Sequence, residues 1–149
     1  MASLSYVDVV DRDLDQISTW SPEDGDDLRA FLQELEDSGD LLERLSSWHY
    51  AHAYADPQFD CRAIDCLQRR GYNVYRLKAL RLEWARRYYR IVYAYDVAYD
   101  DFIVLAVVLR LTDRTPPELR EHCYDYQPNH PITQRICTEY ERLELPVRH

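Results

Sequence analysis

Three segments in the second half of the chain carry the side-chain patterns of β-strands. Residues 74–79 alternate, with apolar side chains on one face and mainly basic ones on the other. In Tyr88–Tyr95 every second residue again shares a face, whereas Phe102–Leu109 is apolar on both faces, as in a strand at the middle of a sheet. Because Asp96–Asp101 has the composition of a turn, the pattern predicts an antiparallel meander of three strands.

The first half of the chain has helical spacing instead. Ser21 is in the place of an N-cap, and a proline follows it, so we predict a helix over Pro22–Asp37. We expect Gly39 to end this helix in a left-handed conformation. Asp40 then caps a second helix with a leucine stripe, which runs on to His52.

The remaining segments give less regular predictions. A third helix is expected to begin at Pro57 and to be closed by Gly71. Its inward positions are Ala63, Ile64 and Leu67. Residues 111–128 are predicted to form a loop with one short helix, and Pro131 opens a last amphipathic helix. The segment Leu4–Val10 is predicted to be an edge strand.

Together these elements predict an α+β fold in a single domain over residues 1–149. N-terminal helices lead into an antiparallel sheet of three to four strands, and a C-terminal helix follows. The length of 149 residues and the hydrophobic content of 46% suit one domain with its own core. Residues 1–20 are interpreted as an acidic N-terminal extension of this domain.

Charge is distributed unevenly along the chain. Residues 1–60 carry 15 acidic and 3 basic side chains, whereas residues 61–95 carry 9 basic and 2 acidic ones. The acidic front is either an interaction surface that screens the basic middle or a pair of solvated helices. No apolar run has the length of a membrane helix and no signal peptide is evident, so we expect a cytoplasmic protein without a membrane partner.

Several familiar kinds of site do not fit the sequence. The four cysteines lack the spacing of a zinc site and are expected to be reduced and mostly buried. His49 and His52 share a helical face, but no third ligand lies near them in the sequence. Three glycines are too few for a phosphate-binding loop, and no Gly-x-Ser-x-Gly turn occurs. We therefore expect neither a metal nor a cofactor.

The strands themselves offer a different chemistry. Arg76 and Lys78 lie two residues apart on the first predicted strand, Arg90 on the second, and Arg110 at the end of the third. Guanidinium groups bind phosphate through paired hydrogen bonds and stabilise charge that develops on a phosphate under attack. The alternative is that arginine merely fills the exposed face of a sheet. Alternation also leaves Tyr88 as the aromatic side chain best placed to stack on a base.

The order of these strands and their local sequences resemble those of the RelE/ParE superfamily of toxins from type II toxin-antitoxin systems. The strings that carry the resemblance are Val74-Tyr75-Arg76-Leu77-Lys78, Tyr89-Arg90-Ile91-Val92-Tyr93-Ala94-Tyr95-Asp96, and Phe102-Ile103-Val104-Leu105-Ala106-Val107-Val108-Leu109-Arg110. The resemblance covers about Gly71–Arg110. It implies a compact domain in which helices precede an antiparallel sheet.

In the RelE branch, the ribose 2′-hydroxyl attacks the neighbouring phosphate of mRNA in the ribosomal decoding site. The resemblance therefore implies a metal-independent endoribonuclease whose catalytic residues are Arg76, Lys78, Arg90 and Arg110. The candidate RNA-binding residues beside them are Arg81, Arg86, Arg87 and Tyr88. The family also has a tyrosine after its last arginine, which the stretch 111–117 lacks, so Tyr124 and Tyr126 are the candidates to replace it.

Three functions follow from these observations. The first is a toxin that cuts mRNA on the ribosome, with growth inhibition as its effect and a cognate antitoxin as its partner. The second is a ParE-like inhibitor of a protein such as a topoisomerase, without catalysis. The third is a non-toxic binding module whose acidic front docks on a basic partner, with an affinity that falls as salt is added.

Overall fold

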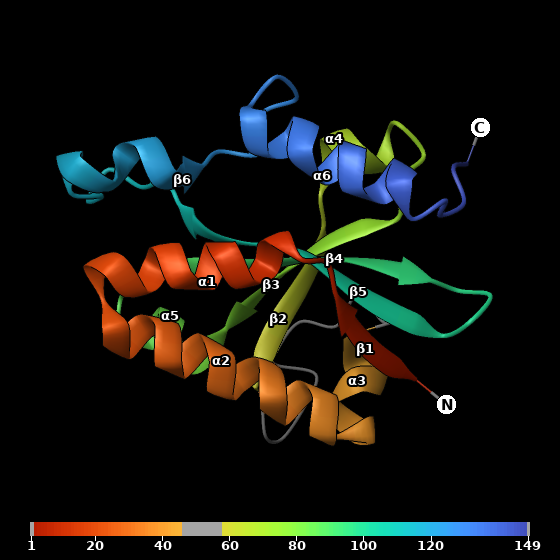
Figure 1. Ribbon diagram of the computed structural model, residues 1–149, viewed down its shortest axis with the longest axis horizontal. Coiled ribbons are helices and arrows are strands. Elements are labelled where there is room, and N and C mark those ends of the chain that lie inside the picture. The colour runs from red at the N-terminus through yellow and green to blue at the C-terminus, as the bar shows by residue number, and fades with distance from the viewer. Residues whose placement is uncertain (1, 46–57, 149) are drawn as a thin grey trace.

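A mixed β-sheet lies between two layers of helices in the computed structural model, which describes residues 2–45 and 58–148 (Figure 1). Helices α1 and α2 cover one face of the sheet, and α4 and α6 lie on the other. In chain order the elements are β1 (Ser3–Tyr6), α1 (Val9–Trp20), α2 (Pro22–Asp37), α3 (Gly39–Leu45), β2 (Phe59–Ala63), α4 (Asp65–Gln68), β3 (Val74–Ala79), α5 (Leu80–Trp84), β4 (Tyr89–Asp96), β5 (Asp101–Arg110), the 3-10 helix η2 (Pro117–His122), β6 (Cys123–Tyr124) and α6 (Pro131–Arg142).

The sheet has six strands in the order β1-β5-β4-β3-β2, with β6 also paired to β5. Strands β2 to β5 form an antiparallel meander, and β1 and β6 are parallel to β5. The α+β class, the three-strand meander and the C-terminal helix are thus confirmed. The prediction of a purely antiparallel sheet of three to four strands was wrong, because the two short parallel strands extend it.

Strand β2 replaces most of the helix that was expected to begin at Pro57. Phe59 and Cys61 are buried, while Asp60 and Arg62 point to the other face, which is the two-residue period of a strand. Only the short helix α4 is helical here. Gly71 does follow it in a left-handed conformation, with φ +88°, and the carbonyl oxygen of Arg148 leaves no room for a Cβ atom there.

The N-terminal residues are part of the domain rather than an extension of it. Strand β1 is the predicted edge strand, with Ser3–Tyr6 paired to Asp101–Val104, but it ends before Val10. Helix α1 follows, and its buried side chains at helical spacing pack into the core. These side chains are Val10, Leu14 and Ile17.

The helix predicted over Pro22–Asp37 is present with the expected cap, because the backbone N–H of Asp24 donates to the Ser21 hydroxyl at 3.2 Å. Its end differs from the prediction. Ser38 is extended and accepts a hydrogen bond from the N–H of Leu41, so Ser38 rather than Asp40 caps α3. The continuation of that helix to His49 and His52 lies outside the described residues.

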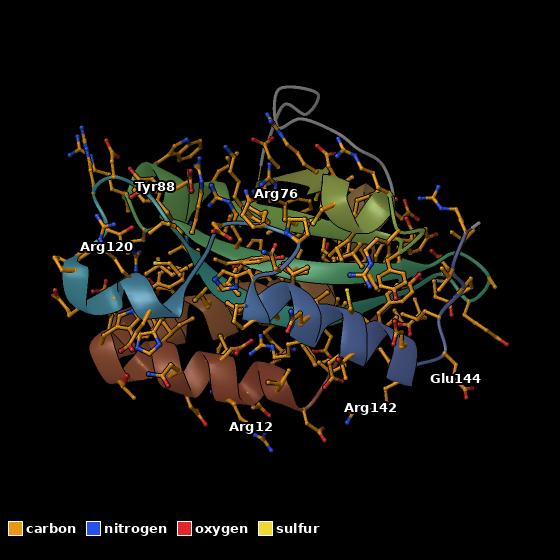
Figure 2. All side chains as sticks on the ribbon, turned by 90° about the horizontal axis from the view of Figure 1, so that it is seen from above. Arg12, Arg76, Tyr88, Arg120, Arg142 and Glu144 are labelled. Carbon is orange, nitrogen blue, oxygen red and sulfur yellow. The ribbon has the colours of Figure 1, made fainter. Side chains whose placement is uncertain are left out.

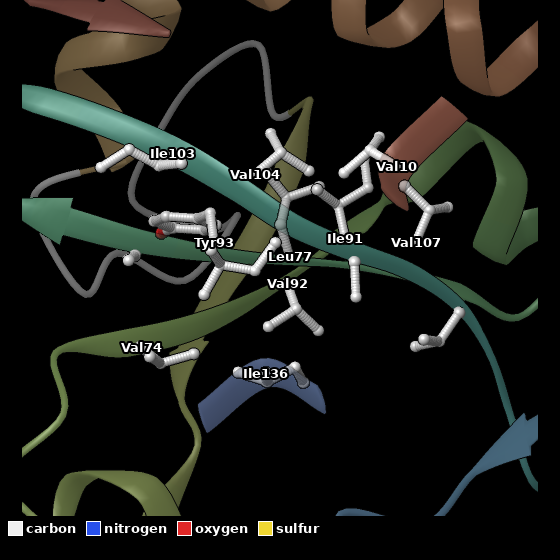
Figure 3. Packing of buried hydrophobic residues seen from close by; sticks show 14 of the residues in the cluster. Val10, Val74, Leu77, Ile91, Val92, Tyr93, Ile103, Val104, Val107 and Ile136 are labelled. Carbon is white, nitrogen blue, oxygen red and sulfur yellow. The ribbon is translucent and has the colours of Figure 1, made fainter. Parts of the chain in front are cut away.

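The core fills both faces of the sheet (Figure 3). On one side Ile91 and Val107 lie toward Val10 of α1, and on the other Val92 lies toward Ile136 of α6. The four cysteines are unpaired thiols, and Cys66 alone among them is not fully buried. Within the described ranges, no helix has both the length and the apolar character to cross a bilayer.

Candidate functional site

The register of the sheet gathers charged side chains on the face that carries α6. Residues opposite one another in antiparallel strands point to the same side, and Arg62 pairs with Arg76 while Asp60 pairs with Lys78. Arg76 in turn lies opposite Val92, the residue that faces α6. Alternation along β4 then places Arg90 on this same face.

Helix α6 covers only part of that face. Val74, Val92 and Ala94 lie fully buried on it, whereas Figure 2 shows Arg76 beside α6 rather than beneath it. The uncovered part is hollowed into a cavity of about 140 Å³, which we call the basic pocket. Its lining residues are Asp60, Arg62, Arg76, Lys78, Arg90 and Arg110. Five cations thus surround one carboxylate.

The four residues that the sequence identified as catalytic therefore line one pocket, and β2 adds Asp60 and Arg62 to them. The sequence reading missed these two because it assigned their segment to a helix. The signal that could have found them is the alternation of Phe59 and Cys61 with the two charged side chains.

Arg90 differs from the other cations of the pocket because it is only 5% exposed. Its Nη1 and Nη2 atoms donate to the two carboxylate oxygens of Glu83 at 2.9 and 3.2 Å. Nη1 also donates to the backbone carbonyl of Tyr89 at 2.9 Å. This forked contact neutralises the guanidinium, so Arg90 shapes the wall of the pocket while Arg62, Arg76 and Lys78 supply more accessible charge.

Lys78 and Asp60 place a donor and an acceptor of protons side by side. The Nζ atom of Lys78 lies 3.8 Å from Oδ2 of Asp60, at the long end for an ion pair. Both side chains are partly buried, with 30% and 16% of their surface exposed. The basic pocket thus contains an ammonium and a carboxylate group side by side, the two kinds of group used in general acid–base catalysis.

Tyr126 supports the pocket from the segment between β6 and α6. The Cζ atom of Arg76 lies 4.4 Å from the centre of the Tyr126 ring, which is the geometry of a cation–π contact. Burial raises the pKa of the Tyr126 hydroxyl, and the cations of Arg76, Arg90 and Arg110 oppose that shift. Tyr126 also has φ 63°, an uncommon value for a residue with a side chain.

Tyr124, the other candidate for the missing tyrosine, is fully buried. Its hydroxyl and that of Thr133 on α6 are 2.6 Å apart. Tyr124 therefore fastens α6 to the sheet, and Tyr126 is the tyrosine that lies against the basic pocket.

The residues predicted to bind RNA beside the pocket divide into three groups. Arg87 donates to Asp24 and to Asp27, both at 2.7 Å, and the hydrogen bond to Asp24 is the main reason that the pKa of Arg87 is raised. Arg81 lines a separate groove between α2 and α5. Arg86 and Tyr88 line a second cavity that touches the basic pocket at Arg110.

These positions also show how the first two long helices of the acidic front lie relative to the basic middle. Helices α1 and α2 lie on the face opposite to α6, so they do not screen the basic pocket. Asp24 and Asp27 pair with Arg87 instead.

Comparisons of the chain with protein-family models, curated proteins and solved structures find no match.

The chemistry of the basic pocket suits a phosphate. Arginine binds phosphate oxygens through its planar fork, and lysine adds a point charge that can also give up a proton. Among the described residues, no cluster of three or more His, Cys, Asp or Glu side chains is arranged to hold a metal ion. The side chains of the basic pocket thus suit the binding of an anion by the arginines, with the Asp60 carboxylate and the Lys78 ammonium beside them.

Proposed function

We propose that the basic pocket binds a phosphodiester of RNA and that the protein is a RelE-like toxin, a metal-independent endoribonuclease acting on mRNA at the ribosome. The observation that carries this proposal is the convergence of Arg76, Lys78, Arg90 and Arg110 in one cavity. These four residues come from three strands, β3, β4 and β5.

The pocket holds the groups that an internal attack on phosphate needs. In the proposed reaction the ribose 2′-oxygen forms a bond to phosphorus while the bond to the 5′-oxygen breaks, leaving a cyclic phosphate and a 5′-hydroxyl. Asp60 accepts the proton of the 2′-hydroxyl and Lys78 donates one to the leaving oxygen. Arg76 and Arg110 stabilise the negative charge on the phosphate, as preorganised cations do.

The remaining residues have supporting roles in this proposal. Arg90, fixed by Glu83, orients the wall, and the ring of Tyr126 holds the Arg76 guanidinium in place. The partners are mRNA and a cognate antitoxin, which covers the pocket with an acidic or amphipathic segment.

The test is induced expression in a bacterium, with growth and the 5′ ends of cellular mRNA as readouts. We compare the wild type with the Arg76→Ala/Lys78→Ala and Asp60→Asn variants. The control is Arg12→Ala, because Arg12 is exposed on α1, away from the pocket. Arg90→Ala is a poorer probe, since its side chain is buried.

We expect growth arrest with new cuts from the wild type and the control, and neither effect from the pocket variants. Cuts that persist in both pocket variants would overturn the proposal, as would the absence of any effect from the wild type.

A protein target is the second candidate. Trp84 is 71% exposed at the end of α5, beside a groove that Phe31 and Leu82 also line. Exposed tryptophan is typical of protein interfaces. Arrest without cuts, unaffected by the pocket variants but lost in Trp84→Ala, would favour the inhibitor of a protein such as a topoisomerase.

A further inference from the structure

The second cavity next to the basic pocket points to a ligand of its own. This cavity, of about 290 Å³, lies where β5 ends and β4 begins, and we call it the loop cleft. Residues of its lining include Arg86, Tyr88, Leu109, Arg110, Pro116 and Leu119. We propose that the loop cleft binds the nucleoside adjacent to the phosphate in the basic pocket, an inference that rests on the proposed function.

The position of the cleft relative to the basic pocket is the first reason. Arg110 lines both cavities. The N–H of Arg110 donates to the carbonyl of Tyr88 at 2.8 Å, so the ends of β4 and β5 are joined at the boundary. Consecutive nucleosides in RNA are linked by one phosphate. A phosphate bound at Arg110 therefore brings the neighbouring base to the mouth of the loop cleft.

The composition of the walls is the second reason. Leu109, Pro116 and Leu119 give the cleft apolar surface, and the half-buried ring of Tyr88 adds an aromatic one. Bases bind single-strand sites mainly by stacking on such surfaces, with about 1–3 kcal/mol for each stacked base. Arg86 and Arg114 are exposed at the rim, where their guanidinium groups attract the RNA backbone.

One wall is rigid because the loop after β5 is internally bonded. The N–H of Thr112 donates to the Thr115 hydroxyl at 2.9 Å, and the N–H of Arg114 donates to the Thr112 hydroxyl at 3.2 Å. Thr115 is itself buried. The loop is thus formed before a ligand arrives, which lowers the entropic cost of binding.

The opposite wall is a satisfied polar network. Trp20 donates through Nε1 to the Tyr89 hydroxyl at 2.9 Å, and that hydroxyl donates to Asp24 at 2.7 Å. Arg87 neutralises the Asp24 carboxylate. Because Asp24 is already paired, it does not repel a nucleotide, and the charge at the mouth comes from Arg86, Arg110 and Arg114.

The size of the cleft limits the ligand. Pockets that bury drug-sized molecules have about 300–1,000 Å³, so a cavity at the lower end of that range accommodates one nucleoside. The inference therefore concerns a single flanking base, not a longer stretch of sequence.

The experiment uses the full chain and two short probes. One is a ribodinucleotide with a deoxyribose on the 5′ side of its phosphate, which prevents cleavage. The other has the same backbone and lacks the base on one side, and it is made in two versions, one for each side of the phosphate. The binding variants are Tyr88→Ala and Leu119→Trp, of which the second fills the cleft. The matched control is Tyr99→Ala, because Tyr99 is 79% exposed in the turn between β4 and β5.

We expect the wild type and the control to bind the dinucleotide roughly tenfold more tightly than the probe that lacks a base, whichever side proves to be the bound one. Both cleft variants should bind the two probes equally, with unchanged melting temperatures. A different result would be that the wild type binds all probes equally, with a loss of affinity only in Arg76→Ala/Lys78→Ala. This result would overturn nucleoside binding in the loop cleft and would leave the proposed function standing. No binding of either probe would overturn both.

Discussion

The position of Arg90 could be predicted from the sequence, whereas its contacts could not. Its strand, face and neighbours follow from the alternation along β4. Its burial does not, because Glu83 lies on a separate short helix, and no local pattern indicates that α5 folds its carboxylate under the guanidinium. The same limit applies to Tyr126, which reaches Arg76 through a turn with a left-handed residue rather than through a regular element.

The contact of Arg90 with Glu83 gives the first prediction. Replacing Glu83 with Ala leaves a buried guanidinium without its carboxylate, which should lower the free energy of unfolding by roughly 3 kcal/mol. Urea denaturation followed by circular dichroism measures this change. The control is Glu118→Ala, at an exposed position of η2. An unchanged midpoint for Glu83→Ala would show that Arg90 is solvated in the folded protein.

At the scale of elements, the sequence predicted most of what lies in long, regular segments. The meander β3–β5 and the helices α2 and α6 have complete apolar stripes and clear caps. Strand β2 was missed because five residues are too few to separate a two-residue period from a helical one, and Ala63, Ile64 and Leu67 favoured the helix. Helix α1 was missed although Val10, Leu14 and Ile17 have helical spacing, because its acidic residues suggested a tail.

One side chain joins three of these elements. Asp13 on α1 accepts hydrogen bonds from Arg135 on α6 at 2.9 and 2.8 Å. It also accepts one from the backbone N–H of Val107 on β5 at 3.0 Å. Burial raises the pKa of Asp13, and Arg135 and the Val107 N–H oppose that shift. The ionised carboxylate is thus acceptable in this buried place mainly because Arg135 faces it.

The second prediction follows from that pairing. Arg135→Ala should destabilise the protein by roughly 3 kcal/mol at neutral pH, because the buried Asp13 carboxylate loses its partner. As the pH falls toward 3.8, the ordinary pKa of an aspartate, Asp13 is protonated and the difference from the wild type should shrink. Thermal unfolding over this pH range measures the difference in stability between the variant and the wild type.

Arg142→Ala on the same helix is the control, since its side chain is 63% exposed. A difference that does not depend on pH would rule out the ionised pair as its cause.

At the scale of the whole molecule, charge is separated between the two helical layers. The acidic residues of α1 and α2 lie on one side of the sheet, and the basic pocket lies on the other. The sequence predicted the imbalance of charge between the two halves of the chain. Only the arrangement of the sheet shows that the acidic helices and the basic pocket lie on opposite faces. An acidic protein of net charge -9 can in this way present a cationic site to an anionic ligand.

Tyrosines throughout the molecule lead to the third prediction. Eight tyrosines have a raised pKa, chiefly because of burial or a hydrogen bond to a carboxylate, and that of Tyr6 reaches about 12. The unfolded chain ionises them near pH 10.0, so above that pH the folded state binds more protons than the unfolded state. Stability is therefore fully present below pH 10.0 and falls as the pH rises further.

Thermal melting between about pH 8 and pH 11, with tyrosinate absorbance recorded in parallel, measures this loss. We expect the melting temperature to fall as the absorbance appears in the unfolding transition. If tyrosinate formed near pH 10.0 in the folded protein without a loss of stability, the raised pKa values of these side chains would be contradicted.

The pairing of the first strand with the fifth has a consequence for how the protein is made. Ser3 contacts Asp101, 98 residues later, and Asp13 contacts Arg135, 122 residues later. Contacts at such separations form late and slowly during folding. A nascent chain consequently carries its basic strands out of the ribosome before the elements that support them have been translated. The basic pocket therefore gains the Tyr126 ring beside Arg76, and the neighbouring helix α6, only after these later segments have emerged.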